Sequence, residues 1–213
     1  GLFFFLKSKK IQVESKKKFN FPKRFFVASI ISGFSVNAFL TFDVLLTKHF
    51  LTPRLAGEYA FLSLVGKMIY FFGSMFSTFI IPFVGRDMGA NKDPNKSFYK
   101  ILTAATLLTT VMFIAVGFFG RYFLPLIFGV KAYPVLPYIK LYSLAIAMYV
   151  ITSSIVNYHL ARHHYVFPAT ALLLSMAMSI GIVLFHNTVA DIVMVVLIVS
   201  MVSLDVMLLL HIL

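Results

Sequence analysis

Six long apolar segments, separated by short polar or proline-containing breaks, form the pattern of this chain. A bilayer core of roughly 30 Å is crossed by about 20 apolar residues in a helix, and each segment is long enough to do so. The segments lack period-2 alternation and unpaired strands do not cross lipid, so we predict helices. The predicted spans are residues 25–49, 54–83, 97–119, 136–161, 165–186 and 189–213.

Local signals mark the breaks between these spans. Thr52 and Pro53 provide an N-cap and a proline at the first position of the second helix. Residues 85–95 predict a polar turn, and Thr188 or Asp191 is expected to cap the last helix. The segment 120–137 combines proline and glycine with apolar residues, which predicts an irregular segment at the membrane interface.

Composition agrees with a membrane protein. Hydrophobic residues make up 60% of the 213 residues and charged residues only 12%, whereas about a quarter of an average soluble domain is charged. There is no cysteine, so no disulfide framework is expected. There is no tryptophan either, so tyrosine and phenylalanine must occupy the membrane interfaces. The predicted fold class is therefore an all-α polytopic membrane protein, a bundle of six transmembrane helices.

The basic residues indicate orientation rather than nucleic-acid binding. The net charge of +12 comes largely from residues 1–24 and from the connections between spans. We interpret residues 1–24 as a basic cytoplasmic linker, with residues 2–6 as the end of a preceding helix, and residues 25–213 as the bundle. Lysine and arginine favour the cytoplasmic side, which places both ends of this piece on the cytoplasmic side of the cell membrane. Because the chain starts at Gly1 and stops within an apolar run, we interpret it as a fragment.

Two ionisable side chains interrupt the first two spans. They are Asp43 in the first span and Lys67 in the second. An ionisable residue within a span is costly, so both are candidate functional residues. At 100° per residue Asp43 lies on a stripe of small and polar residues, and Lys67 shares a stripe with Ser63 and Ser74. Such stripes favour either close helix packing or the wall of a hydrated cavity. We interpret the two charges as cavity residues, because packing does not require charge.

The two charges are not predicted to lie at the same level. At 1.5 Å per residue, Asp43 lies about 10 Å from the turn between the spans and Lys67 about 21 Å from it. A lysine side chain is long enough to span part of this difference in depth, but the sequence does not require a direct ion pair.

Other polar residues in the spans are weaker candidates. Asp205 lies about 21 Å along the last span, counted from Asp191, and is predicted to be a buried acid that either carries a cation or faces a partner outside this piece. Asn157 shares a helix face with two serines and is a candidate cavity residue. No acid or cysteine accompanies the histidines His159, His163 and His164, so an interfacial role is favoured over a metal site.

The sequence contains no catalytic signature. It has no G-x-x-x-x-G-K-[ST], H-E-x-x-H or G-x-S-x-G pattern. We therefore expect no enzymatic activity, no cofactor and no metal. If the chain takes part in transport, the energy must come from an ion gradient, the membrane potential or the substrate gradient.

The hairpin from Asp43 to Ile69, DVLLTKHFLTPRLAGEYAFLSLVGKMI, resembles the polysaccharide transporter family of the multidrug/oligosaccharidyl-lipid/polysaccharide exporter superfamily. The segments IPFVGRDMGANKD and LPLIFGVKAY are similar to that family as well. The similar positions in the hairpin are Asp43, Lys48, Thr52-Pro53, Ala56-Gly57, Tyr59 and Gly66-Lys67.

The resemblance implies a larger assembly. Members have two six-helix bundles, related by pseudo-symmetry around a central cavity, and pass lipid-linked sugar repeat units across the cytoplasmic membrane by alternating access. Residues 25–213 would be the second bundle, and its partners would be the bilayer, the lipid-linked sugar and the missing N-terminal half of the same chain, with no nucleic acid. Lys67 would attract the anionic headgroup, and Asp43 would balance it or couple a cation.

Two other functions stay open. A cation-coupled multidrug exporter of the same superfamily would use Asp43 or Asp205 as the ion carrier. A membrane scaffold without a transported substrate would tolerate neutral residues at both charges of the hairpin, but not bulky residues at Gly33 or Gly66.

Overall fold

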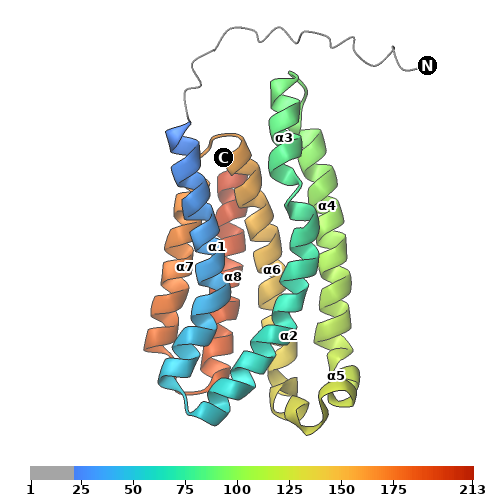
Figure 1. The fold of residues 1–213 in the computed structure, drawn as a ribbon, viewed down its shortest axis with the longest axis vertical. Coiled ribbons are helices and arrows are strands. Elements are labelled where there is room, and N and C mark those ends of the chain that lie inside the picture. The colour runs from blue at the N-terminus through green and yellow to red at the C-terminus, as the bar shows by residue number, and fades with distance from the viewer. Residues whose placement is uncertain (1–21) are drawn as a thin grey trace, which may run out of the picture.

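The computed structural model describes residues 22–213, and within that range every regular element is helical. Six helical segments there are long and apolar enough to cross a membrane, which confirms the predicted all-α, multi-pass membrane fold. The helices pack side by side in a bundle, with the start of α1 and the end of α8 at the same end (Figure 1). Of the predicted basic linker, residues 1–24, residues 1–21 lie outside the described residues, and Lys23 and Arg24 belong to the first helix.

The helices follow most of the predicted spans closely, but residues 120–137, predicted to be irregular, are helical throughout. The α-helices are α1 (Lys23–Phe50), α2 (Pro53–Ser77), α3 (Ile80–Gly89), α4 (Pro94–Phe113), α5 (Gly120–Phe128), α6 (Leu136–Ala161), α7 (Val166–Leu184) and α8 (Val189–Ile212). A π-helix, η1 (Ile114–Phe118), extends α4, and a 3-10 helix, η2 (Gly129–Val135), leads into α6.

Two predicted caps are found at helix starts. Thr52 is the N-cap of α2 with Pro53 at its first position, although the threonine side chain makes no capping hydrogen bond. At the start of α8 the predicted pair acts together: Thr188 accepts from the backbone N–H of Asp191, and the Asp191 carboxylate accepts from the backbone N–H of Thr188. This reciprocal capping box satisfies two N–H groups that the helix itself cannot pair.

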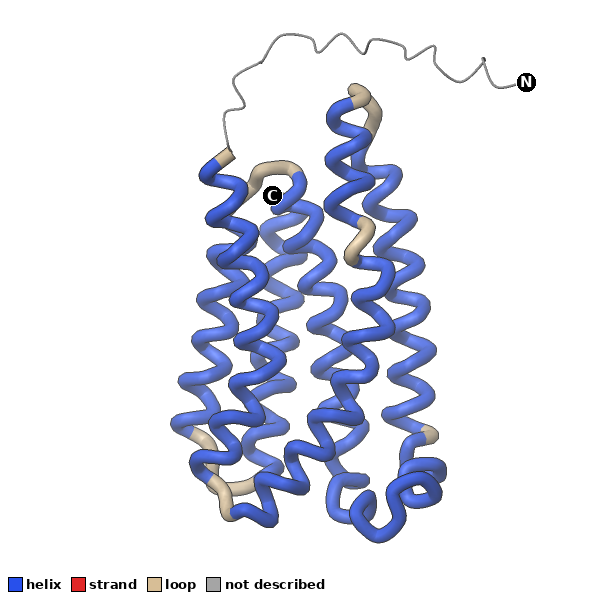
Figure 2. The backbone as a smooth tube through the Cα atoms, viewed as in Figure 1, coloured by secondary structure: helices blue, strands red, loops and turns tan. Residues whose placement is uncertain are grey.

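The second span differs from the prediction. It is broken between α2 and α3, visible as a short loop in Figure 2. Pro82 explains the break, because its ring has no N–H for the carbonyl of Thr78 and clashes with that carbonyl in a continuous helix. The helix then resumes and runs through Gly89, so the predicted polar turn at 85–95 was placed too early. The non-helical residues between α3 and α4 are 90–93.

Helix α6 is the centre of the bundle. In the most apolar stretch of the segment Gly120–Ala161, which contains α6, 72% of the residues are buried. In the corresponding stretches of the other five spans only 22–39% are buried. Helices α2, α4 and α8 all pack against α6, whereas α1 packs mainly against α7. The buried core forms two clusters, one that includes Tyr59, Leu62 and Tyr142 and one around Phe98 and Tyr158 at the end where α8 stops.

Small and hydroxyl residues bring the helices into contact. Ser35 of α1 and Ser175 of α7 are hydrogen-bonded at 3.0 Å, and Ser77 of α2 and Ser154 of α6 at 2.6 Å. Gly73 of α2 lies where three helices meet: a Cβ there would be 2.2 Å from Thr109 Oγ1 of α4 and 2.8 Å from Val150 Cγ1 of α6. Such small-residue contacts are typical of membrane helix interfaces.

Gly73→Ala is therefore expected to lower the free energy of unfolding by about 1–3 kcal/mol, because the added methyl forces α2 away from α4 and α6. Gly33→Ala is the matched control, since a Cβ at Gly33 meets nothing within 4 Å. The control is expected to be neutral or to gain up to about 1 kcal/mol from the better helix propensity of alanine. Denaturant unfolding in detergent micelles compares the two, and equal losses would contradict this packing.

Candidate functional site

The carboxylate of Asp43 is the centre of a buried polar cluster formed by α1, α2 and α6. Lys67 Nζ donates to Asp43 Oδ1 at 2.9 Å, and the hydroxyls of Tyr59 and Tyr142 donate to Oδ2 at 3.0 and 2.7 Å. The backbone N–H of Val44 donates to Oδ1 at 2.8 Å. Both carboxylate oxygens are therefore paired twice at short distance, which compensates the loss of water around this charge.

Ser63 joins the same cluster through a tyrosine. Its hydroxyl lies 3.0 Å from Tyr142 Oη and 3.4 Å from Asp43 Oδ2. Because Tyr142 donates its only hydrogen to Asp43, the single hydroxyl hydrogen of Ser63 is shared between the Tyr142 oxygen and Asp43 Oδ2. Ser63 thus orients Tyr142 and adds a weaker contact to the carboxylate.

The geometry of the hairpin explains how Asp43 and Lys67 meet in spite of their different depths. In a helix every Cα–Cβ bond tilts toward the helix N-terminus. Helices α1 and α2 are antiparallel, so the Asp43 side chain leans away from the turn and the Lys67 side chain leans toward it. The two side chains converge, and the length of lysine closes the remaining gap. The sequence estimate counted only the rise of each helix and so underestimated this pairing.

The sequence spacing on α2 aligns the other donors. Tyr59, Ser63 and Lys67 are four residues apart, which places them on one face of the helix. Tyr142 reaches the cluster from α6 because Gly66 leaves room for its ring: a Cβ at Gly66 would lie 2.3 Å from Tyr142 Cδ1. The two tyrosine rings pack edge to face with their centroids 5.9 Å apart.

Burial distinguishes the two charged residues. The side chain of Asp43 is 2% exposed and that of Lys67 is 12% exposed. The pair is neutral as a whole, so it is compatible with a membrane span. Lys67 is the member that a group outside the bundle can reach, whereas Asp43 is enclosed by its donors.

The remaining predicted residues do not join the cluster. Ser74 donates to the backbone carbonyl of Phe71 on its own helix, and Asn157 is half-buried on α6 with no hydrogen bond to another side chain among residues 22–213. Asp205 was predicted to be buried and is exposed, which corrects that prediction. On α8 the buried small residues are Ser200 and Ser203, and at 100° per residue Asp205 lies on the other side of the helix.

The histidines form a separate group at the end of the bundle where α8 stops. His159 is buried and stacks on Phe167 with ring centroids 3.5 Å apart. Its Nδ1 lies 3.2 Å from Nδ1 of His164, and its Nε2 lies 2.8 Å from Nδ1 of His211. His163 instead contacts Tyr165, and the third histidine of this group is His211, which was not among the residues singled out from the sequence. No group of metal-ligating residues with suitable geometry occurs in the described part of the chain.

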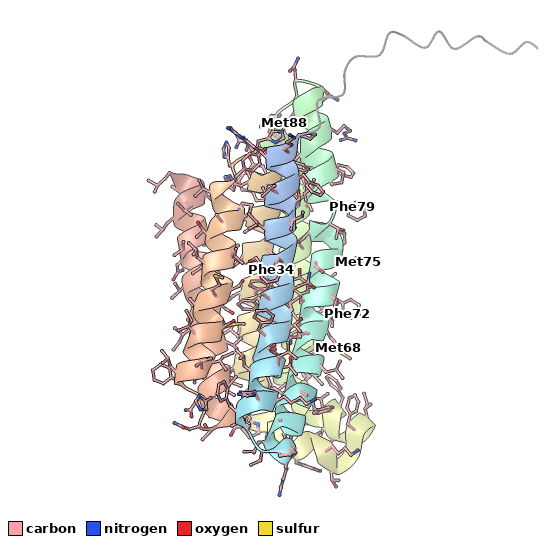
Figure 3. The ribbon with its side chains drawn as sticks, turned by 60° about the vertical axis from the view of Figure 1, so that its left-hand side comes forward. Phe34, Met68, Phe72, Met75, Phe79 and Met88 are labelled. Carbon is pink, nitrogen blue, oxygen red and sulfur yellow. The ribbon has the colours of Figure 1, made fainter. Side chains whose placement is uncertain are left out.

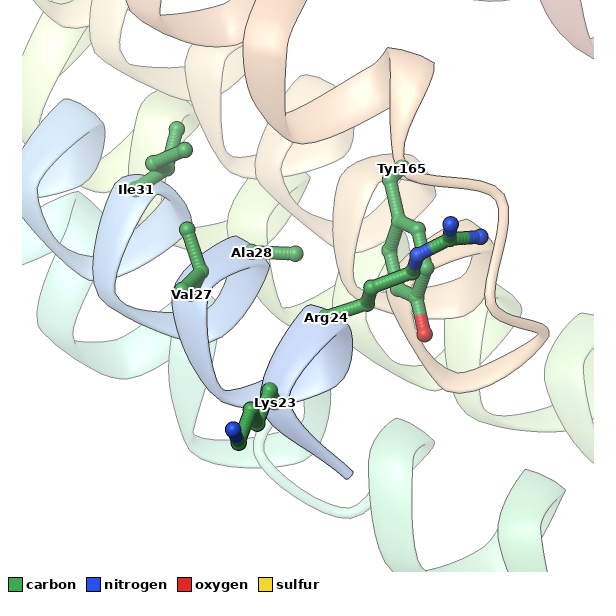
Figure 4. A pocket seen from close by; sticks show the side chains of 6 residues that line it. All are labelled: Lys23, Arg24, Val27, Ala28, Ile31 and Tyr165. Carbon is green, nitrogen blue, oxygen red and sulfur yellow. The ribbon is translucent and has the colours of Figure 1, made fainter. Parts of the chain in front are cut away.

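A shallow pocket of about 330 Å³ lies at the same end, where α1 begins. Its lining combines Lys23 and Arg24 of the first turn of α1 with Tyr165 and apolar residues such as Val27 and Ile31 (Figure 4). Lys23 and Arg24 are the last basic residues of the predicted linker. The pocket is distant in sequence from the hairpin and shares no residue with the Asp43 cluster.

Comparisons of the chain with protein-family models, with curated proteins and with solved structures found no match. The fold and the site by themselves define a class: a multi-pass membrane protein with a buried Asp–Lys pair.

Lys67→Met is expected to lower the free energy of unfolding by about 3–5 kcal/mol, because it leaves the buried Asp43 carboxylate without its counter-charge. The double variant Asp43→Asn/Lys67→Met should lose clearly less than the sum of the two single variants. Equilibrium unfolding in micelles completes this double-mutant cycle.

Arg54→Gln is the control for that cycle, because Arg54 forms an ion pair of similar length, 3.1 Å, with Glu58 while 86% of its side chain is exposed. An exposed pair contributes about 0–1 kcal/mol. Additive effects of Asp43→Asn and Lys67→Met would contradict the direct pairing of the two side chains.

Proposed function

We propose that this chain is one six-helix half of a transporter that moves lipid-linked oligosaccharides across the cytoplasmic membrane by alternating access. The observation that carries the proposal is the Asp43–Lys67 pair, two charges held inside the spans with the lysine partly accessible. An ionisable residue within a span is costly and points to function. The resemblance of the hairpin to the polysaccharide transporter family supplies the substrate class.

Lys67 is the group that would bind the anionic phosphate of such a substrate. In this structure the ammonium group of Lys67 is paired with the Asp43 carboxylate at 2.9 Å, so a phosphate must compete with that carboxylate for it. Tyr59, Tyr142 and the N–H of Val44 keep donating to Asp43 when Lys67 turns away. The carboxylate therefore stays hydrogen-bonded, which lowers the cost of releasing Lys67 to the substrate.

The surface beside Lys67 is apolar and exposed, which suits contact with a partner bundle or with lipid tails. Figure 3 shows Phe34 of α1 and Met68, Phe72 and Met75 of α2 along one side of the bundle, and all four are exposed. Met68 directly follows Lys67 in the sequence. In the proposed transporter the missing N-terminal half faces this side, and the apolar surface accommodates the lipid part of the substrate.

The complete hydrogen bonding of Asp43 favours a second candidate, a purely structural role of the pair in a membrane scaffold. It does not favour a cation-coupled exporter that uses Asp43, because a bound cation must replace several donors at once. Asp205 is exposed and has no ion pair within residues 22–213, so it is the better carrier for that alternative.

Flipping of a fluorescent lipid-linked oligosaccharide by the intact protein in proteoliposomes tests the proposal. Lys67→Ala and the neutral double variant Asp43→Asn/Lys67→Met are expected to slow flipping by at least about 30-fold. Both remove the protein partner of a buried ion pair with the substrate phosphate, which costs about 2 kcal/mol or more. The double variant separates transport from folding, because it leaves no unpaired buried charge.

Lys67→Arg keeps the charge and should retain part of the activity, and Arg54→Gln should retain all of it. If the double variant folds and flips substrate at the wild-type rate, Lys67 is not part of the transport mechanism. If the wild-type protein itself flips no substrate, the scaffold is the better candidate. Efflux of small organic cations that depends on a cation gradient and is lost in Asp205→Asn would identify the exporter instead.

A further inference from the structure

A second site with unpaired charges lies at the end of the bundle opposite the start of α1, where the end of η1, the start of α5 and the start of α6 meet (Figure 1). The pocket has a volume of about 490 Å³, and its walls include Phe118, Arg121, Pro137 and Lys140. It shares no residue with the Asp43 cluster.

Two cations line this pocket, and neither has an acidic partner among residues 22–213. Lys140 Nζ lies 4.5 Å from the centroid of the Phe118 ring, and the Arg121 guanidinium lies 5.6 Å from that of Tyr122. Aromatic faces attract both cations but do not neutralise them. Two like charges in one pocket repel each other, and an anion between them turns that repulsion into attraction.

The local backbone builds the pocket from residues close in sequence. Residues 114–118 form a π-helix, in which the N–H of Phe119 bonds to the carbonyl of Ile114 at 3.3 Å. A π-helical turn inserts one extra residue into a helix and is frequent at functional sites. Here it ends α4 with Phe118 against Lys140, and Arg121 follows in the first turn of α5.

The surroundings of the pocket are apolar in the way expected at the depth of lipid headgroups. Beside it, α5 and η2 expose large apolar side chains: Leu126 is 88% exposed, Val130 80% and Ile127 65%. A short helix with such a surface at the end of a bundle fits the boundary between headgroups and acyl chains. Lys140 lies four residues, or about 6 Å, into α6, so its ammonium group is near the same level.

We propose that this pocket binds the headgroup phosphate of an anionic membrane lipid. Arg121 provides two parallel N–H donors for two phosphate oxygens, and Lys140, also in the wall of the pocket, provides a compact positive charge. The acyl chains continue along the apolar surface of α5. This site does not rest on the proposed transport function, because it involves none of the residues assigned to it.

Titration of the delipidated intact protein with phosphatidylglycerol or phosphatidylcholine of identical acyl chains, followed by native mass spectrometry, tests the proposal. Phosphatidylglycerol should bind more tightly than the zwitterionic lipid. Arg121→Gln and Lys140→Gln should each weaken its binding by about fivefold, the effect of one basic residue near an anionic lipid, and together by roughly 25-fold.

Lys131→Gln is the matched control, because Lys131 lies in η2 at the same end of the bundle but does not line the pocket. It should leave binding unchanged. Equal binding of the two lipids, or an equal loss in the Lys131 variant, would overturn the site. Glycerol phosphate that binds as tightly as phosphatidylglycerol would overturn the lipid assignment, because the acyl chains would then contribute nothing.

Discussion

The desolvation of one carboxylate is the constraint on which this bundle depends. A charge taken out of water costs several kcal/mol unless it is paired and hydrogen-bonded. The chain meets that cost at Asp43 with donors from α2 and α6 and from its own backbone. The same contacts join the hairpin to the central helix. The Asp43 carboxylate therefore links three helices, α1, α2 and α6.

The cluster differs in kind from the other polar contacts of the bundle. The serine pairs between α1 and α7 and between α2 and α6 are neutral and suited to close approach of helices. The Asp43 cluster instead carries two opposite charges, of which only the lysine is partly accessible. The proposed binding of an anion by Lys67 rests on this asymmetry.

Hydropathy predicted the six spans because length and apolar character alone decide which segments cross a membrane. It missed the break before Pro82, since the prediction treated 54–83 as one uninterrupted apolar run. Asp43 and Lys67 stood out as costly charges, and Ser63 followed from its helical spacing. Tyr142 did not, because nothing in the apolar sequence of α6 indicates that it faces a residue 99 positions earlier. Asp205 was misplaced because the prediction relied on its depth in an apolar span and not on the serines of α8: Ser200 and Ser203 are buried, and Asp205 lies on the opposite side of the helix.

Direct observation of the Asp43–Lys67 contact tests the central claim. Among residues 22–213 it is the only ion pair between a lysine and an acid, since the other two involve arginine. Solid-state NMR of the intact protein in bilayers, with ¹⁵N in the lysine side chains and ¹³C in the aspartate carboxyl groups, measures their dipolar coupling. The account predicts a strong coupling that disappears in Asp43→Asn. A wild-type protein without such a coupling would contradict it.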